Sequence, residues 1–183
     1  MISLLPVLPL LLLACLAASP ETPSLPRITD LSKQDTFAKA GISPAQQSAI
    51  AKLLEENSSD WEPNRITQMR VRRVTLSPGK MDGLILHSTA SQDCGATGNC
   101  LLVVLRRRGS QWQPVLPEAF ADGFGLSRTS HGGVYDLAVA GNESAESSSL
   151  TVFAFDGSRY RRNKCFHVAG KVVTPVACSN PGD

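Results

Sequence analysis

Two stretches of this chain repeat one pattern at a constant offset of 48 positions, from Leu102 to Leu150. Residues 102–112 have the sequence Leu-Val-Val-Leu-Arg-Arg-Arg-Gly-Ser-Gln-Trp, and residues 150–160 have the sequence Leu-Thr-Val-Phe-Ala-Phe-Asp-Gly-Ser-Arg-Tyr. In both, an apolar run is followed by a Gly-Ser pair and then by an aromatic residue. Glycine favours the left-handed backbone of a tight hairpin turn, and the aromatic side chain can pack across the two strands. Each stretch therefore predicts strand, turn and strand.

An upstream strand completes each unit. Residues 83–86 and 133–137 begin strands at nearly corresponding places ahead of the two stretches. We therefore expect two related three-stranded antiparallel meanders that share one core, since two copies are too few for a solenoid or a propeller. The predicted fold class is α+β, with a short N-terminal helical pair followed by an antiparallel β-meander domain.

The helical pair is predicted from stop and start signals. Residues 32–40 have the pattern of a short helix that ends at Gly41, with Ile42 packing back against it. Residues 43–46, Ser-Pro-Ala-Gln, supply an N-cap, a proline at the first helical position and a capping-box glutamine. An apolar stripe at helical spacing then continues to about Asn57.

The pattern changes to β after Trp61. The alternation of apolar residues slips its phase at Arg72-Arg73, which predicts a bulge or bend in that strand. The expected organisation is a signal peptide over residues 1–18, an extended linker over 19–30, a helical segment over 31–60 and an antiparallel β domain over 61–183.

The N-terminal leader predicts export. Residues 4–13 form an apolar run of the size of a signal-peptide core, too short to span a bilayer. Residues 12–15, Leu-Leu-Ala-Cys, resemble a bacterial lipobox, in which Cys15 would carry the lipid. The alternative is ordinary cleavage near residues 17–19, Ala-Ala-Ser. We expect a periplasmic or outer-membrane lipoprotein, or a secreted protein, with membrane contact only through a lipid on Cys15.

The other four cysteines predict disulfides, because an exported chain meets an oxidising environment. Four cysteines allow three connectivities. We favour Cys94–Cys100, which encloses a glycine-containing loop, and Cys165–Cys178, which encloses a hairpin. Neither spacing is that of a zinc site or of a Cys-x-x-Cys redox pair, so we predict no metal and no cofactor.

Composition excludes one class of partner. The chain has 183 residues, with 18 Lys and Arg against 16 Asp and Glu, for a net charge of +2. A protein that binds nucleic acid through a domain-wide positive field is therefore not expected.

Several motifs resemble those of uncharacterised exported bacterial proteins. They are Cys-Gly-Ala-Thr-Gly-Asn-Cys at residues 94–100, Gly-Val-Tyr-Asp-Leu at residues 133–137 and Phe-Asp-Gly-Ser-Arg-Tyr at residues 155–160. This resemblance implies export and a β-rich fold, and it implies no activity.

No established catalytic motif is present, which favours a protein that is not an enzyme. A hydrolase that uses Asp136 and His131 is the alternative, because the two residues are close in sequence. However, Tyr135, Leu137 and Val139 alternate as a core face, which would leave Asp136 on the opposite face beside Val134.

Arginines gather on the predicted strands and turns more than the net charge suggests. They could protect strand edges from aggregation, or form a stripe that binds an unknown protein or an envelope polymer. We predict a non-enzymatic, inhibitor-like or binding module of the cell envelope that acts through strand edges or loops. A purely structural periplasmic module is a further alternative. The candidate partner-binding residues are Arg70, Arg72, Arg106, Arg108, Arg159 and Arg161.

Overall fold

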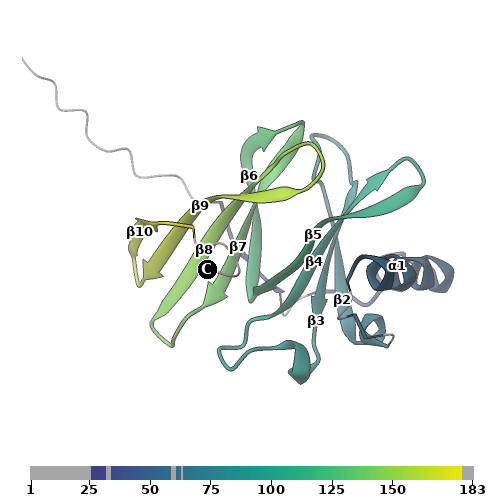
Figure 1. Cartoon of the computed structure of the whole chain (residues 1–183), viewed down its shortest axis with the longest axis horizontal. Helices are drawn as coiled ribbons and strands as arrows, with labels where there is room; N and C mark the ends of the chain where they lie inside the picture. Colours follow the sequence, from purple (N-terminus) through teal and green to yellow (C-terminus); the bar gives the residue numbers. More distant parts are fainter. Residues whose placement is uncertain (1–25, 32–33, 59–60, 63, 179–183) are drawn as a thin grey trace, which may run out of the picture.

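The computed structural model describes residues 26–31, 34–58, 61–62 and 64–178. The predicted signal peptide, the predicted lipidation site Cys15 and most of the predicted linker lie outside the described residues. Those described form two antiparallel sheets and one α-helix (Figure 1). The elements are β1 (Thr29–Asp30), α1 (Pro44–Asn57), η2 (Arg65–Gln68), β2 (Met69–Val74), β3 (Gly83–Ser88), η3 (Ser91–Asp93), β4 (Cys100–Arg108), β5 (Gln111–Ala121), β6 (Gly123–His131), β7 (Val134–Asn142), β8 (Ser147–Phe155), β9 (Tyr160–Ala169) and β10 (Val172–Val176).

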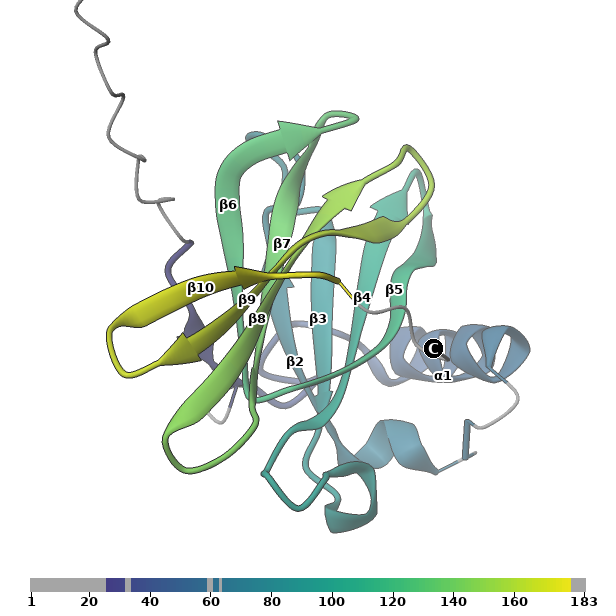
Figure 2. The same cartoon turned by 60° about the vertical axis from the view of Figure 1, so that its left-hand side comes forward.

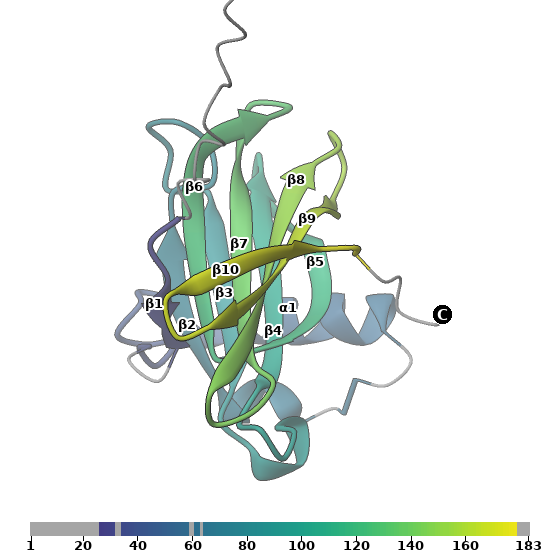
Figure 3. The same cartoon turned by 90° about the vertical axis from the view of Figure 1, so that its left-hand side faces the viewer.

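The strands run up and down in chain order. One sheet has the order β2-β3-β4-β5 and the other the order β1-β6-β7-β8-β9-β10. The chain crosses between them at Asp122, and among the described strands only β1 pairs with a strand distant in sequence. The six-stranded sheet lies in front of the four-stranded sheet in Figure 3, with α1 on the far side. The fold is thus three layers, and the chain is β-rich as predicted.

The two repeated stretches fall in different sheets. Residues 102–112 form β4, a turn and the start of β5, whereas residues 150–160 form β8, a turn and the start of β9. Gly109 and Gly157 have φ values of 61° and 101° in these turns, the left-handed region that favours glycine. The turns of β4–β5, β6–β7 and β8–β9 lie at the same end of the molecule (Figure 2), which we name the turn end.

Strand β2 contributes side chains to two cores, and this explains why its apolar alternation changes phase at Arg72-Arg73, where a bulge or bend was predicted. This strand pairs with β3 in continuous register from Met69 to Val74, so it has no bulge. Met69 and Val71 pack in the core beneath α1, whereas Val74 packs in the core between the sheets. The sequence pattern slips because both faces of this sheet are buried and the apolar residues pass from one core to the other.

One α-helix is present where a helical pair was expected. The helix α1 has the predicted capping box, in which Ser43 and Gln46 exchange hydrogen bonds between side chain and main chain. In the described part of 32–40, the chain forms a turn, not a helix. The turn ends as expected, with Gly41 at φ 68° and the Ile42 N–H donating to the Phe37 carbonyl. Just before this turn, Asp35 forms a β-bridge with Val71 of β2.

Residues 26–31, which we name the N-terminal arm, continue the six-stranded sheet along β6. Thr29 and Asp30 pair with Phe124 and Gly123. The main chain of Arg27 approaches so closely that a Cβ atom built on Gly125 would lie 2.5 Å from the Arg27 carbonyl oxygen. Glycine at this position on β6 is therefore required by the close approach of the arm.

Both predicted cysteine pairs lie at disulfide distance. The sulfur atoms of Cys94 and Cys100 are 1.98 Å apart, and those of Cys165 and Cys178 are 2.10 Å apart. The first bond closes the loop ahead of β4, and the second ties the end of β10 to β9. Two such bonds indicate an oxidising, extracellular-type compartment.

Candidate functional site

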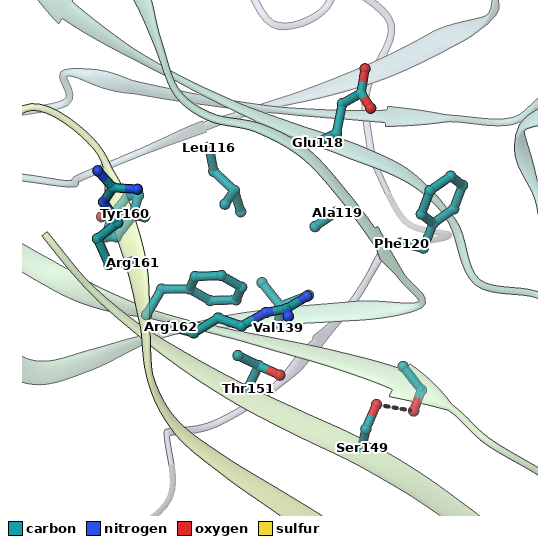
Figure 4. A pocket seen from close by; sticks show the side chains of 12 residues that line it. Leu116, Glu118, Ala119, Phe120, Val139, Ser149, Thr151, Tyr160, Arg161 and Arg162 are labelled. Carbon is teal, nitrogen blue, oxygen red and sulfur yellow. Dashed lines mark hydrogen bonds between the residues drawn. The ribbon is translucent and has the colours of Figure 1, made fainter. Parts of the chain in front are cut away.

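A cleft of about 460 Å³ opens where the edge strand β5 parts from the six-stranded sheet. We name it the inter-sheet cleft, and Figure 4 shows it from close by. Strand β5 forms one wall, and β7, β8 and β9 form the other. The lining residues are Leu116, Glu118, Ala119, Phe120, Val139, Gly141, Ser149, Thr151, Phe153, Tyr160, Arg161 and Arg162.

The floor of the cleft is apolar and buried, whereas the rim carries an exposed aromatic ring. Val139, Phe153 and Tyr160 are buried, because they belong to the core between the sheets. Phe120, in contrast, is 60% exposed at one end of the cleft. An exposed aromatic ring beside a hollow is a common feature of binding surfaces, since it offers a large apolar area at little cost in conformational entropy.

Charged groups lie along the same rim. The Arg162 side chain runs through the cleft beside Val139 (Figure 4). The carboxylate of Glu118 accepts a hydrogen bond from the Ser58 hydroxyl at 2.8 Å, which fixes it toward the end of α1. The Arg161 guanidinium lies 2.8 Å from Asp156.

The turn after β8 holds Asp156 in the position where it contacts Arg161. The Arg159 N–H, the Arg161 guanidinium and the Ser158 N–H and hydroxyl all donate to Asp156. These donors, the Arg159 N–H first, hold the pKa of Asp156 well below its ordinary value. The arrangement orients Arg161 beside the cleft.

The six predicted arginines do not gather into one stripe. Arg161 lines the inter-sheet cleft, and Arg159 is exposed in the neighbouring turn. Arg72 lies over the Phe124 ring at 5.9 Å, at the opposite edge of the sandwich, and Arg70 lies on the same strand. Arg108 donates to the Gly157 carbonyl at 2.6 Å and so joins two hairpin turns.

Arg106 is part of a polar cluster at the turn end. Its guanidinium lies 3.2 Å from Asp82, donates to the Ser77 hydroxyl and covers the Phe155 ring. Partial burial acts to raise the pKa of Asp82, but hydrogen bonds from Ser77 and the charge of Arg106 outweigh it and hold the pKa below its ordinary value. Burial raises the pKa of the nearby Tyr160, whose hydroxyl donates to the Tyr135 carbonyl. This cluster closes one end of the core.

His131 and Asp136 are brought together across the β6–β7 hairpin. The Nδ1 atom of His131 lies 2.6 Å from Oδ1 of Asp136, which is 3% exposed. Of the predicted core face, Leu137 and Val139 pack in the core between the sheets, but Val134 packs there in place of Tyr135. The pairing of β6 with β7 is irregular between Leu126 and Ser130, which shifts the alternation at this end.

The pair engages one ring nitrogen of His131, whose side chain is half-exposed. Among the described residues, no serine or threonine hydroxyl forms a hydrogen bond with His131. A nucleophilic triad needs three groups: a carboxylate, the histidine that it orients, and a hydroxyl or thiol nucleophile that the histidine activates. The described residues therefore supply a buried acid and a half-exposed imidazole without an activated hydroxyl.

No three His, Cys, Asp or Glu side chains of the described chain are close enough together to hold a metal ion. Within the same residues, no helix is long and apolar enough to cross a membrane. Comparison of the chain with protein-family models, curated proteins and solved structures finds no match.

The residues that line the cleft around Arg161 were not predicted from the sequence. Phe120, Glu118 and Arg162 lie on strands β5 and β9, which belong to different sheets and are separated by three intervening strands. The one signal available was Phe120 itself, an aromatic residue between Ala119 and Ala121 that breaks the pattern of the core-facing positions.

Proposed function

We propose that this protein is an exported binding module that holds an extended segment of a partner protein in the inter-sheet cleft. The observation that carries the proposal is the cleft itself, which joins a buried apolar floor to an exposed Phe120 and to the guanidinium of Arg162. Apolar contact at the floor would supply affinity, and charged groups at the rim would select the partner and its orientation.

The free strand edges are less suited to binding. One edge strand of each sheet contains proline: β5 has Pro114 and Pro117, and β10 has Pro175. At the other two edges, β2 is bridged at Val71 by Asp35, and β1 is only 2 residues long. Proline has no N–H for an added strand, and edge prolines are a common protection against pairing with other chains. This favours the cleft over the strand edges as the site of contact.

Site-specific cross-linking tests the proposal. A benzophenone amino acid would replace Phe120 in one variant and Met81, which is equally exposed at 59%, in a control variant. After irradiation in envelope extracts, we expect one discrete protein adduct from position 120 and none from position 81. Arg162→Glu should abolish the adduct, and Arg159→Glu, a charge reversal outside the cleft, should preserve it.

Three results would contradict it. The same adducts from both positions would show non-specific contact, and an adduct that carries glycan would identify an envelope polymer. Absence of any adduct from position 120 would favour the structural periplasmic module.

A hydrolase is the second candidate, supported by the 2.6 Å contact between His131 and the buried Asp136. Turnover of ester or amide substrates that is lost in Asp136→Ala, with the circular dichroism spectrum unchanged, would favour it. Turnover that is absent from the wild-type protein, or equal in the variant, would exclude this role for the pair.

Export through a lipoprotein signal, and the interpretation of the sheets as two related three-stranded meanders, also stay proposals. The constant offset of 48 positions between the two Gly-Ser turns supports the second. Mass spectrometry of the mature chain tests the first: a lipoprotein begins at an acylated Cys15, and ordinary cleavage would instead place the N-terminus near Ser19.

A further inference from the structure

His87 is a buried histidine whose ring nitrogens form no well-aligned hydrogen bond with the described residues. It lies on β3 with 7% of its surface exposed, on the face of the sheet that meets the other sheet. Neither Nδ1 nor Nε2 has a hydrogen-bond partner among the described residues. Buried polar atoms are nearly always hydrogen-bonded, so an exception calls for an explanation.

Three charged groups face this ring from different elements. Arg70 on β2 is the cross-strand neighbour of His87 on one side. Its neighbour on the other side, Leu102 on β4, is uncharged. The carboxylates of Asp122, at the crossover between the sheets, and Asp30, on β1, act on His87 through their charges. A protonated ring here would be attracted by these two carboxylates but would lose its hydration through burial.

The N-terminal arm meets the crossover at this place. The Leu31 N–H donates to the Asp122 carbonyl at 3.0 Å, and the Leu31 side chain is 1% exposed. Beyond this, the arm is held by the pairing of Thr29 and Asp30 with β6. A short terminal strand with so few pairs is the kind of element that opens locally before the rest of a domain unfolds.

We propose that uptake of a proton by His87 releases the N-terminal arm from β6, so that the arm is docked at neutral pH and detaches in acid. The neutral ring fits the dry space between the sheets. The charged ring needs water, and detachment of Leu31 and Asp30 from the crossover admits it.

The electrostatics support this direction. Burial lowers the pKa of His87, and this effect outweighs the opposing influence of the Ala121 main chain, Asp122 and Asp30. A histidine with a lowered pKa in the closed state stabilises that state above its ordinary pKa near 6.5, and the stabilisation is lost as pH falls. Between pH 7.5 and pH 5, the equilibrium for opening should rise by at most about 30-fold for one such group.

Hydrogen exchange on the full chain tests the proposal. We expect the Leu31 amide to lose protection by up to about 30-fold from pH 7.5 to pH 5, after correction for intrinsic exchange. The Val103 amide, in the middle of β4, should keep its protection. In His87→Leu and in the polar control His87→Gln, the Leu31 amide should show no such dependence.

A second measurement keeps the test decisive if a variant fails to fold. The ring of His87 in the wild-type protein can be titrated by NMR, and its midpoint should coincide with that of the Leu31 exchange. Exchange of Leu31 that ignores pH, or that changes equally with Val103, would overturn the proposal. So would a dependence that persists in His87→Leu.

Discussion

A single methyl group at Gly125 would test how the N-terminal arm is docked. The Cβ of Gly125→Ala would lie 2.5 Å from the Arg27 carbonyl oxygen and 3.1 Å from its carbonyl carbon. Both are main-chain atoms and cannot rotate away. At Gly123, the nearest atom is instead a side-chain atom, the Cγ2 methyl of Ile28, at 2.5 Å. The substitution at Gly125 must therefore displace the arm itself.

The magnitude follows from two limits. Overpacking of this kind costs about 1–3 kcal/mol. The cost cannot exceed that of letting the arm detach, which exposes Leu31 and loses about 1.5–3 kcal/mol of hydrophobic burial together with its strand pairs. Alanine also restricts the unfolded chain, which returns about 0.4–1 kcal/mol. We expect a net loss of about 1–2 kcal/mol in the free energy of unfolding.

Urea unfolding followed by tryptophan fluorescence measures this loss, and trypsin reports on the arm through cleavage after Arg27. Gly125→Ala should be cut faster than the wild type at that bond. The control is Gly95→Ala, where a Cβ would meet nothing closer than 3.9 Å, and it should leave both readouts nearly unchanged. A Gly125→Ala protein as stable and as resistant as the wild type would refute the close approach of the arm.

Three further predictions concern the buried polar groups and the disulfides. His87→Leu should raise the free energy of unfolding at pH 7 by about 1–3 kcal/mol, because it removes unsatisfied polar atoms, and should abolish the loss of wild-type stability below pH 6.5 in urea titrations. Replacing Cys165 and Cys178 together by alanine should lower the free energy of unfolding by about 3 kcal/mol, measured by thermal denaturation. Asp82→Asn should destabilise by about 1–3 kcal/mol above pH 4, where the wild-type carboxylate is ionised, and the difference should vanish as pH falls below that range because the lowered pKa of Asp82 is then passed. An Asp82→Asn penalty that does not depend on pH would contradict this account.

Local features of the fold were predictable from sequence. The capping box at Ser43, the glycine turns at Gly109 and Gly157 and the cysteine pairing all depend on residues near one another in the chain. The short helix expected over 32–40 did not form beyond one turn. Its few residues cannot sustain a helix against the competing bridge of Asp35 to β2.

The division into two sheets was not predictable from alternation alone. Strands β2, β3 and β4 are buried on both faces, so their apolar residues do not mark one core. The pairing of His131 with Asp136 could be suspected from their proximity. Leu137 and Val139 pack in the core as expected, and only at the hairpin end, where the pairing of β6 is irregular, does Val134 take the place expected for Tyr135. The inter-sheet cleft depends on contacts between strands of different sheets, which local patterns do not predict; Phe120 marked an unusual position on β5 but not the strands that lie opposite it.

The up-and-down order of the strands has a consequence for how the chain folds. Nearly every strand pairs with the strand next to it in sequence, so most of these pairings close only short loops. Strand β1 is the exception, because Thr29 pairs with Phe124, 95 positions further on. Among the described strands, the one nearest the N-terminus thus waits longest for its partner. Until β6 has been synthesised, β1 has no strand edge with which to pair.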